Sequence, residues 1–201
     1  MLNPLKICLF LIATAVCTFD SHSQSNWTLK KDKNGIKVYT KDHETKNIKY
    51  YRLITEFKGN YDKVVDLNLD FDNYESWVRD CEESEVLQTE GSTTIIYRAK
   101  YDTPWPVSDR DFVSEVRIQR TENITSITTL PSDFDYPMES GVVRITDYQD
   151  NWKVSEMDGG MVKLELEGYY SPGGSIPPWL VNLFIVDAPY ESMLRLRELA
   201  K

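Results

Sequence analysis

The sequence predicts an α+β fold in which a curved antiparallel sheet wraps around a long C-terminal helix. From residue 85 onward, apolar and polar residues alternate with a period of two through several runs, as in strands that have one face in water. Residues 61–69 and 179–197 instead place apolar residues at helical spacing. No repeat or long linker divides the chain, so one domain is expected.

Alternation also predicts two strands ahead of the first helix, at residues 35–40 and 49–57. Gly59 and Asn60 interrupt the pattern before the helix at 61–69. Residues 71–78 either extend that helix or form a second short one. The later strands are expected at residues 95–101, 115–119, 124–130, 141–148, 152–154 and 162–167.

The C-terminal segment is predicted to form one long helix with Ser175 as its N-cap. Pro177 and Pro178 fit its first turn, where proline costs no hydrogen bond. Pro189 has no N–H to donate to the Ile185 carbonyl and is expected to kink the helix.

A curved sheet and a helix do not necessarily fill the space between them. The chain contains 12 Tyr and 5 Trp, so its aromatic side chains either fill that space or line a cavity that holds an apolar ligand. The candidate ligand-binding residues come from the inward strand faces and from the last helix: Tyr97, Ala99, Tyr101, Val116, Ile118, Val143, Ile145, Leu164, Leu166, Trp179, Leu183, Val186 and Tyr190.

Charge and composition exclude several classes of function. The chain has 23 Lys and Arg against 32 Asp and Glu, a net charge of −9, which argues against a nucleic-acid partner. Beyond residue 23 it contains one cysteine, Cys81, and one histidine, His43. These counts leave no disulfide, zinc cluster or Ser–His–acid triad, so no metal or cofactor is expected. A hydrolase that uses paired carboxylates stays open.

The first residues are expected to be a signal peptide. Residues 7–19 form an uncharged apolar run of 13, which is short for a membrane span of about 20 and typical of a secretory signal. Ser21 and Ser23 predict cleavage before Gln24, which gives a signal at 1–23 and a domain at 24–201. A lipoprotein signal at Cys17 is a poorer match. Export to the periplasm or the outside of the cell is therefore expected.

Four blocks of the sequence resemble the START (steroidogenic-acute-regulatory-related lipid transfer) domain family. They are residues 35–39 (GIKVY), 108–113 (SDRDFV), 167–182 (EGYYSPGGSIPPWLVN) and 194–199 (LRLREL), within a resemblance that spans about residues 26–200. The family implies a helix-grip fold, a curved antiparallel sheet around a long C-terminal helix. It also implies that a sterol, phospholipid or other apolar ligand binds in an internal tunnel.

The resemblance also bears on single residues. Sterol carriers of the family have a buried acid–arginine pair on neighbouring cavity strands. Counted from Arg110, the matching positions here are Tyr97 and Val116, which implies a different polar anchor. Arg110 and Asp111 are interpreted as a structural ion pair or strand-entry cap rather than as ligand contacts.

Two loops have candidate roles beside the cavity. Trp105, between two prolines, is expected either to pack beneath the sheet or to close the cavity mouth. Residues 129–141 form the longest uncommitted segment, and loops of this length are often functional, so a mobile lid is expected there.

The first hypothesis for function is non-catalytic binding or transport of a lipid or other hydrophobic small molecule in the cavity. Because the acidic surface does not attract anionic lipid, any membrane contact is expected to be apolar or transient. The alternatives are a helix-grip enzyme of the cyclase or hydrolase type, and a protein-interaction module with a filled cavity.

Overall fold

The structure is a computed structural model that describes residues 26–173, 176 and 178–201. The predicted signal peptide, the expected N-cap Ser175 and Pro177 lie outside the described residues. The side chain of Trp179 is also outside the description, although its backbone belongs to a helix.

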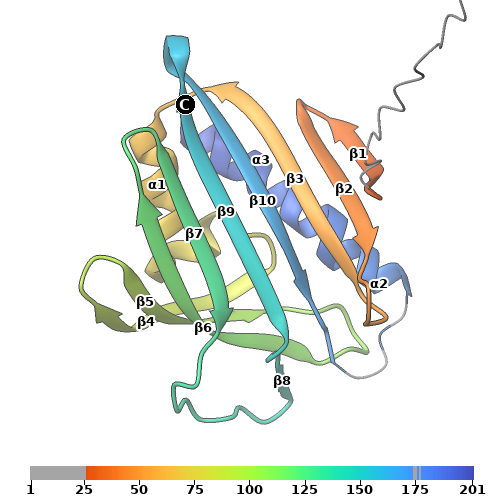
Figure 1. Cartoon of the computed structure of the whole chain (residues 1–201). Helices are drawn as coiled ribbons and strands as arrows, with labels where there is room; N and C mark the ends of the chain where they lie inside the picture. Colours follow the sequence, from red (N-terminus) through yellow and green to blue (C-terminus); the bar gives the residue numbers. More distant parts are fainter. Residues whose placement is uncertain (1–25, 174–175, 177) are drawn as a thin grey trace, which may run out of the picture.

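The strands of the described chain form one curved sheet in the order β1-β2-β3-β10-β9-β7-β6-β5-β4 (Figure 1). These neighbours are antiparallel, and the short β8 adds parallel pairing beside the start of β6. The strands are β1 (Thr28–Lys33), β2 (Ile36–Asp42), β3 (Lys49–Lys58), β4 (Cys81–Glu90), β5 (Thr94–Tyr101), β6 (Asp109–Arg120), β7 (Ile124–Pro131), β8 (Val142–Arg144), β9 (Tyr148–Met157) and β10 (Met161–Tyr170).

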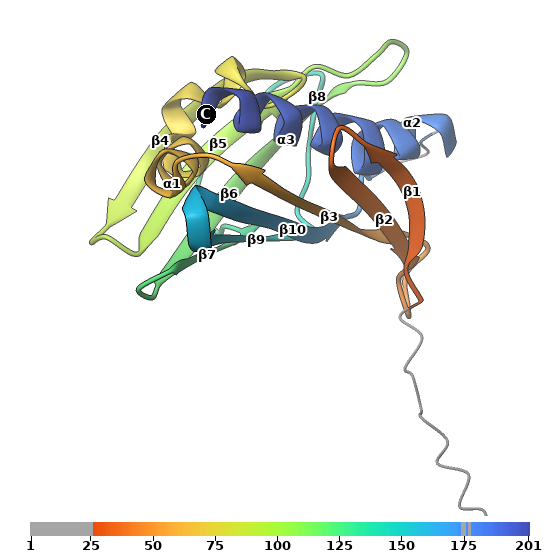
Figure 2. The ribbon, with the colours of Figure 1, turned by 90° about the horizontal axis from the view of Figure 1, so that it is seen from above.

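The helices lie on one side of this sheet, and the C-terminal helical segment runs across its concave face (Figure 2). An apolar core fills much of the space between the two layers, with Leu53, Leu164, Met193 and Leu196 almost fully buried. The helical elements are α1 (Tyr61–Leu69), the 3₁₀ helices η1 (Phe71–Ser76) and η2 (Asp158–Gly160), α2 (Pro178–Asn182), the π-helical turn η3 (Leu183–Asp187) and α3 (Ala188–Leu199). The predicted α+β architecture is confirmed.

Most element predictions are confirmed, and two need correction. The helix at 61–69 has those bounds, and the Asn60 side chain caps it by accepting a hydrogen bond from the Lys63 N–H at 2.9 Å. The edge strand β1 and the first residues of β4 were not predicted. Of the strand predicted at 141–148, Val142–Arg144 pair with β6 and Tyr148 begins β9, while the residues between them are not in a strand.

The C-terminal helix runs without a break from Pro178 to Leu199, as predicted, and its middle part is the π-helical turn η3. The Ala188 N–H donates to the Leu183 carbonyl, five residues back, so the chain makes a π-helical turn immediately before Pro189. Pro189 cannot donate to the carbonyl four residues back, and the wider turn accommodates that loss. None of the helices in the described part of the chain has the length and apolar character needed to cross a membrane.

The two outermost strands are irregular. β1 is bulged between Leu29 and Lys31, and β4 is bulged between Cys81 and Glu83 and again between Val86 and Gln88. An extra residue in one strand bends it and breaks the ladder of hydrogen bonds locally.

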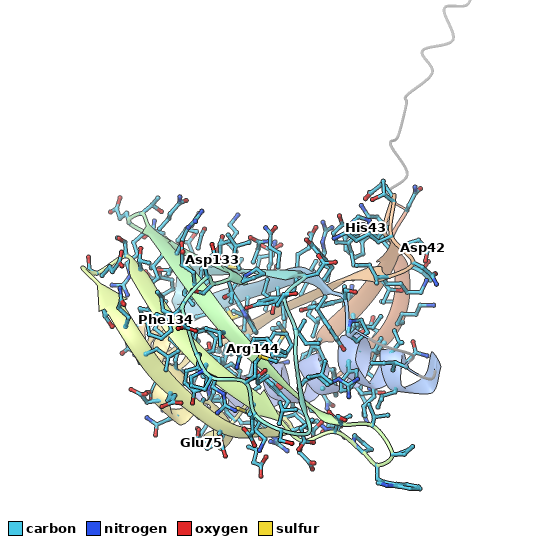
Figure 3. All side chains as sticks on the ribbon, turned by 90° about the horizontal axis from the view of Figure 1, so that it is seen from below. Asp42, His43, Glu75, Asp133, Phe134 and Arg144 are labelled. Carbon is cyan, nitrogen blue, oxygen red and sulfur yellow. The ribbon has the colours of Figure 1, made fainter. Side chains whose placement is uncertain are left out.

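The outer face of the sheet carries a network of ion pairs centred on Asp111, whose side chain is 1% exposed. Its carboxylate accepts from Arg98 Nε at 3.3 Å and from Arg144 Nη2 at 2.6 Å. Arg98 and Lys100 in turn donate to Glu139 at 2.9 and 3.0 Å. Glu139 lies in the loop 132–141, so the network fixes that loop against β5 and β6; Figure 3 shows Arg144 and Phe134 in this region.

Candidate functional site

A cavity of about 180 Å³ lies between the concave face of the sheet and the C-terminal helical segment. It is lined by residues of β3, β5, β6, β7, β9 and β10, by the end of η1 and the turn after it, by the loop after β5, and by η3 and the first half of α3. Eleven of the lining residues are aromatic, which places much of the aromatic content of the chain on a cavity wall: Tyr51, Tyr74, Trp77, Tyr97, Tyr101, Phe112, Tyr148, Trp152, Tyr169, Tyr170 and Phe184.

Three of the candidate residues, Tyr97, Tyr101 and Leu166, line this cavity. Val143 is 37% exposed, Leu183 is half-buried in the π-helical turn, and the Trp179 side chain is not described. The others are buried among their neighbours and do not reach the cavity: Ala99, Val116, Ile118, Ile145, Leu164, Val186 and Tyr190. These residues have the inward orientation of core positions, but packing partners occupy the space in front of them.

The cavity contains a buried acid, Asp150 of β9, which the sequence reasoning missed. Its Oδ1 accepts a short hydrogen bond from the Tyr51 hydroxyl. Burial raises the pKa of Asp150 to about 6, and the Tyr51 hydrogen bond opposes that rise.

Gly168 of β10 faces this pair in the ladder, opposite both Asp150 and Tyr51. A Cβ at residue 168 would lie 2.0 Å from Asp150 Oδ1 and 2.5 Å from the Gln149 carbonyl oxygen. Glycine at this position therefore makes room for the Asp150–Tyr51 hydrogen bond.

Arg110 and Asp111 form no ion pair with each other, but Asp111 forms structural ion pairs with Arg98 and Arg144. Successive residues of a strand point to opposite faces. Arg110 accordingly lines the cavity, whereas Asp111 joins the network on the outer face. Arg110 Nη1 donates to the Ser108 carbonyl, and its Nε has no partner among the described residues.

The two positions matched to the family's buried charged pair are uncharged here. Tyr97 lines the cavity, and Val116 is fully buried in the core. Another polar contact in the wall joins Ser114 Oγ and the Tyr148 hydroxyl at 2.7 Å. The charged groups of the cavity thus come from positions other than those inferred from the family.

The other two side chains considered for catalysis, Cys81 and His43, lie in environments that give them structural roles. Burial raises the pKa of the Cys81 thiol to about 12, so the reactive thiolate is disfavoured. The His43 ring stacks on Tyr50 at 4.8 Å, and its Nδ1 accepts from the Thr45 N–H at 3.2 Å. Figure 3 shows His43 and Asp42 at the tip of the β2–β3 hairpin.

Neither of the two loops lines the cavity as expected. Trp105 is 91% exposed and neither packs beneath the sheet nor lines the cavity. Of the segment 129–141 expected to form a lid, Thr129 lines the cavity but belongs to β7. Residues 132–141 contribute no lining residue, and the ion pairs of Glu139 hold them on the outer face, which is not the position of a lid over the cavity.

Comparison with known proteins gives a consistent result. The sequence model of a family described as polyketide cyclase / dehydrase and lipid transport matches residues 62–190. An uncharacterized protein of Pseudomonas aeruginosa is 35% identical over 177 residues, which cover 88% of this chain and 87% of that protein. Phosphatidylcholine transfer protein of Bos taurus is 25% identical over 157 residues, covering 69% of this chain and 73% of that one.

Solved structures agree with these relationships. A STAR-related lipid transfer protein fragment from Xanthomonas axonopodis has a TM-score of 0.78 and 30% identity, and the match covers 88% of this chain and 100% of that fragment. Human StAR-related lipid transfer protein 5 has a TM-score of 0.79 at 18% identity, over 89% of this chain and 88% of that one. An aromatase/cyclase from a Streptomyces species shares the fold, with a TM-score of 0.52 and 12% identity over 76% of this chain and 91% of that one.

Proposed function

We propose that this chain binds and carries a lipid or other hydrophobic small molecule without changing it chemically. The chain belongs to the polyketide cyclase / dehydrase and lipid transport family and is related to the START lipid-transfer proteins. The observation that carries the proposal is the aromatic-walled cavity of about 180 Å³ beside the C-terminal helix. Removing apolar ligand surface from water drives such binding, at about 25 cal/mol per Å².

The size of the cavity indicates how the ligand enters. A dry cavity of about 150 Å³ holds a molecule the size of benzene, and pockets for drug-sized ligands are commonly about 300–1,000 Å³. A longer lipid therefore needs the C-terminal helix, which lines one side of the cavity, to move away from the sheet. Ala188 and Pro189 are lining residues next to the π-helical turn, which places that irregular turn where the movement is required.

The direct test is native mass spectrometry of the gently purified protein, followed by exchange with added lipid. An Ala188→Phe variant adds a phenyl ring that fills most of the cavity, so we expect it to lose co-purified and exchangeable ligand. Leu199→Phe is the matched control, because Leu199 is 42% exposed on the same helix. Equal ligand loading in both variants, or no ligand in the unmodified protein, would contradict the proposal.

A second candidate function, an enzyme acting on an apolar substrate, is favoured by one observation. Asp150 is a cavity carboxyl whose pKa burial raises to about 6, within the range of a general acid or base. The test is to incubate the protein with its identified ligand and look for a product of different mass. Turnover that Asp150→Asn abolishes would establish the enzyme, and an unchanged ligand mass would leave carriage as the function.

Export is part of the proposal, since the apolar run at residues 7–19 and the small residues Ser21 and Ser23 support a cleaved signal. Cell fractionation and the N-terminal sequence of the mature protein test it. The expected form begins at Gln24 and lies outside the cytoplasm, and a cytoplasmic protein that keeps residues 1–23 would refute this part.

A further inference from the structure

Arg110 is a buried cation that forms no ion pair within the described residues, although the charge of Asp109 acts on it. The residue is 7% exposed, its Nη1 donates to the Ser108 carbonyl, and its Nε makes no hydrogen bond. None of the ion pairs in the described chain includes it. The neighbouring Asp109 carboxylate accepts from the Thr103 N–H at 3.0 Å. Keeping a charge buried without a partner is costly, so the site is incomplete as it stands.

Three further polar groups without partners belong to residues that line the same cavity. The Tyr170 hydroxyl, Thr103 Oγ1 and Trp77 Nε1 are buried and make no hydrogen bond within the described chain. Burial raises the pKa of the Tyr170 phenol well above its usual value, and the positive charge of Arg110 opposes that rise, which places the two groups near each other. A neutral phenol, a hydroxyl and a guanidinium can all donate hydrogen bonds to one acceptor.

We infer, on the basis of the proposed lipid-binding function, that this end of the cavity binds the anionic head group of an amphiphile, a carboxylate or a phosphate monoester. Arg110 is the ion-pair partner, and Tyr170 and Thr103 supply additional donors. Guanidinium groups bind both kinds of anion through paired N–H donors. The hydrocarbon chain then lies among the apolar and aromatic walls, which include Phe112 and Leu166.

The polar contacts already made in the cavity favour an anionic rather than a cationic head group at Arg110. Asp150 accepts a hydrogen bond from Tyr51, whereas the partner of Arg110 is the Ser108 carbonyl. A cationic head group would be repelled by Arg110 and would leave its Nε without a partner, whereas an anionic one satisfies it. The other charged residues of the cavity lining are Arg79, Asp80 and Asp102.

The experiment compares three twelve-carbon probes by isothermal titration calorimetry: dodecanoate, dodecyl phosphate and dodecanol. The unmodified protein is expected to bind at least one anionic probe about 10- to 100-fold more tightly than dodecanol, the range for charge-assisted hydrogen bonds. The tighter of the two anions identifies the head group. Arg110→Met should remove this preference, and Arg110→Lys should keep part of it. Arg195→Met, at an exposed residue of α3, is the charge-matched control and should keep all of it.

Tyr170→Phe removes only the hydroxyl without a partner, so it keeps the test informative if Arg110→Met fails to fold. We expect it to weaken binding of the anion several-fold and to leave dodecanol unchanged. Equal affinity for all three probes, or equal losses for anion and alcohol in folded Arg110→Met, would overturn the head-group inference and leave apolar binding intact. If no probe binds the unmodified protein, the proposed function itself fails.

Discussion

Gly168 illustrates how one small residue on β10 allows a polar pair inside an apolar cavity. The Asp150–Tyr51 hydrogen bond occupies the position that a side chain at residue 168 would need. The pair is therefore a property of three strands, β3, β9 and β10, which must stay in register to keep it.

A Gly168→Ala substitution tests this steric requirement. The added methyl group collides with a backbone carbonyl as well as with Asp150, so rotation of one side chain cannot relieve the contact. Overpacking of this kind costs about 1–3 kcal/mol of the free energy of unfolding. Urea denaturation measures the loss, and Gly91→Ala is a control because a Cβ there meets no neighbour, although its backbone φ is +61°. A loss at residue 168 no larger than at residue 91 would refute the argument.

Asp150 also predicts a dependence of stability on pH. Its pKa of about 6 in the folded protein exceeds the ordinary Asp value of about 3.9, so the native state holds a proton that the unfolded chain releases. The contribution of Asp150 to the free energy of unfolding therefore falls as the pH rises from about 4 to about 6, with a slope of the order of 1 kcal/mol per pH unit.

Urea unfolding of the unmodified protein and of Asp150→Asn at several pH values measures this contribution, because other carboxyl groups cancel in the difference. The advantage of the Asn variant should grow between pH 4 and pH 6 and then level off. Parallel pH profiles would show that Asp150 titrates normally.

Single residues of the cavity were only partly predictable from sequence. Alternation gives the face of a strand on which a residue lies, and it placed Tyr97 and Tyr101 correctly on the inward face. It does not tell whether a partner fills the space in front, which is why Val116 and Leu164 are packed core residues. Asp150 alternates with Tyr148 and Trp152 along the sequence, so the three residues share one face of a strand. An acidic residue on the same strand face as two aromatic residues was the sequence signal that could have revealed it.

At the scale of elements, the Asp111 network joins β5, β6 and the loop 132–141 on the face of the sheet away from the cavity. The carboxylate has two arginine partners and is almost fully buried, and removing one side of a buried pair leaves the other charge without compensation. The same network explains why a long loop next to the sheet is held in place.

An Asp111→Asn variant should accordingly lose about 3–5 kcal/mol of the free energy of unfolding. The exposed Arg117–Glu115 pair on the same strand gives the control, since Glu115→Gln should cost less than about 1 kcal/mol. Denaturant unfolding of both variants tests the prediction, and similar losses would show that burial of the network contributes little.

Elements were predictable where local pattern and tertiary packing agree. The helix at 61–69 has an N-cap, helical spacing and a glycine-containing break before it, and its bounds were predicted correctly. β1 has the sequence TLKKDK, which lacks alternation because an edge strand buries little, so no pattern revealed it. The pairing of β8 with β6 depends on residues far apart in the sequence, beyond the reach of a local pattern.

For the molecule as a whole, the net charge of −9 and the exposed Trp105 bear on how a ligand would leave the cavity. An acidic protein is not drawn to anionic lipid, whereas an exposed indole favours the membrane interface. The loop that carries Trp105 is continuous with Asp102 and Thr103 of the cavity wall. We therefore propose brief apolar contact with membranes through this loop.

A transfer assay with a pyrene-labelled fatty acid and vesicles checks this contact. Trp105→Ala should slow transfer several-fold without changing affinity, and added anionic lipid should not speed transfer by the unmodified protein. Met138→Ala is the control, because Met138 is 66% exposed in the loop on the outer face. Equal slowing in both variants, or strong acceleration by anionic lipid, would contradict it.

The bulges in the two outer strands affect whether copies of the molecule can join edge to edge. β1 carries Lys30, Lys31 and Lys33, whereas β4 carries Glu82, Glu83, Glu85 and Glu90, so the two rims of the sheet carry side chains of opposite charge. An unbroken ladder would let such copies polymerise rim to rim into a continuous ribbon. The bulges interrupt the spacing of donors and acceptors on both rims, and this mismatch opposes fibre growth even where the charges favour contact.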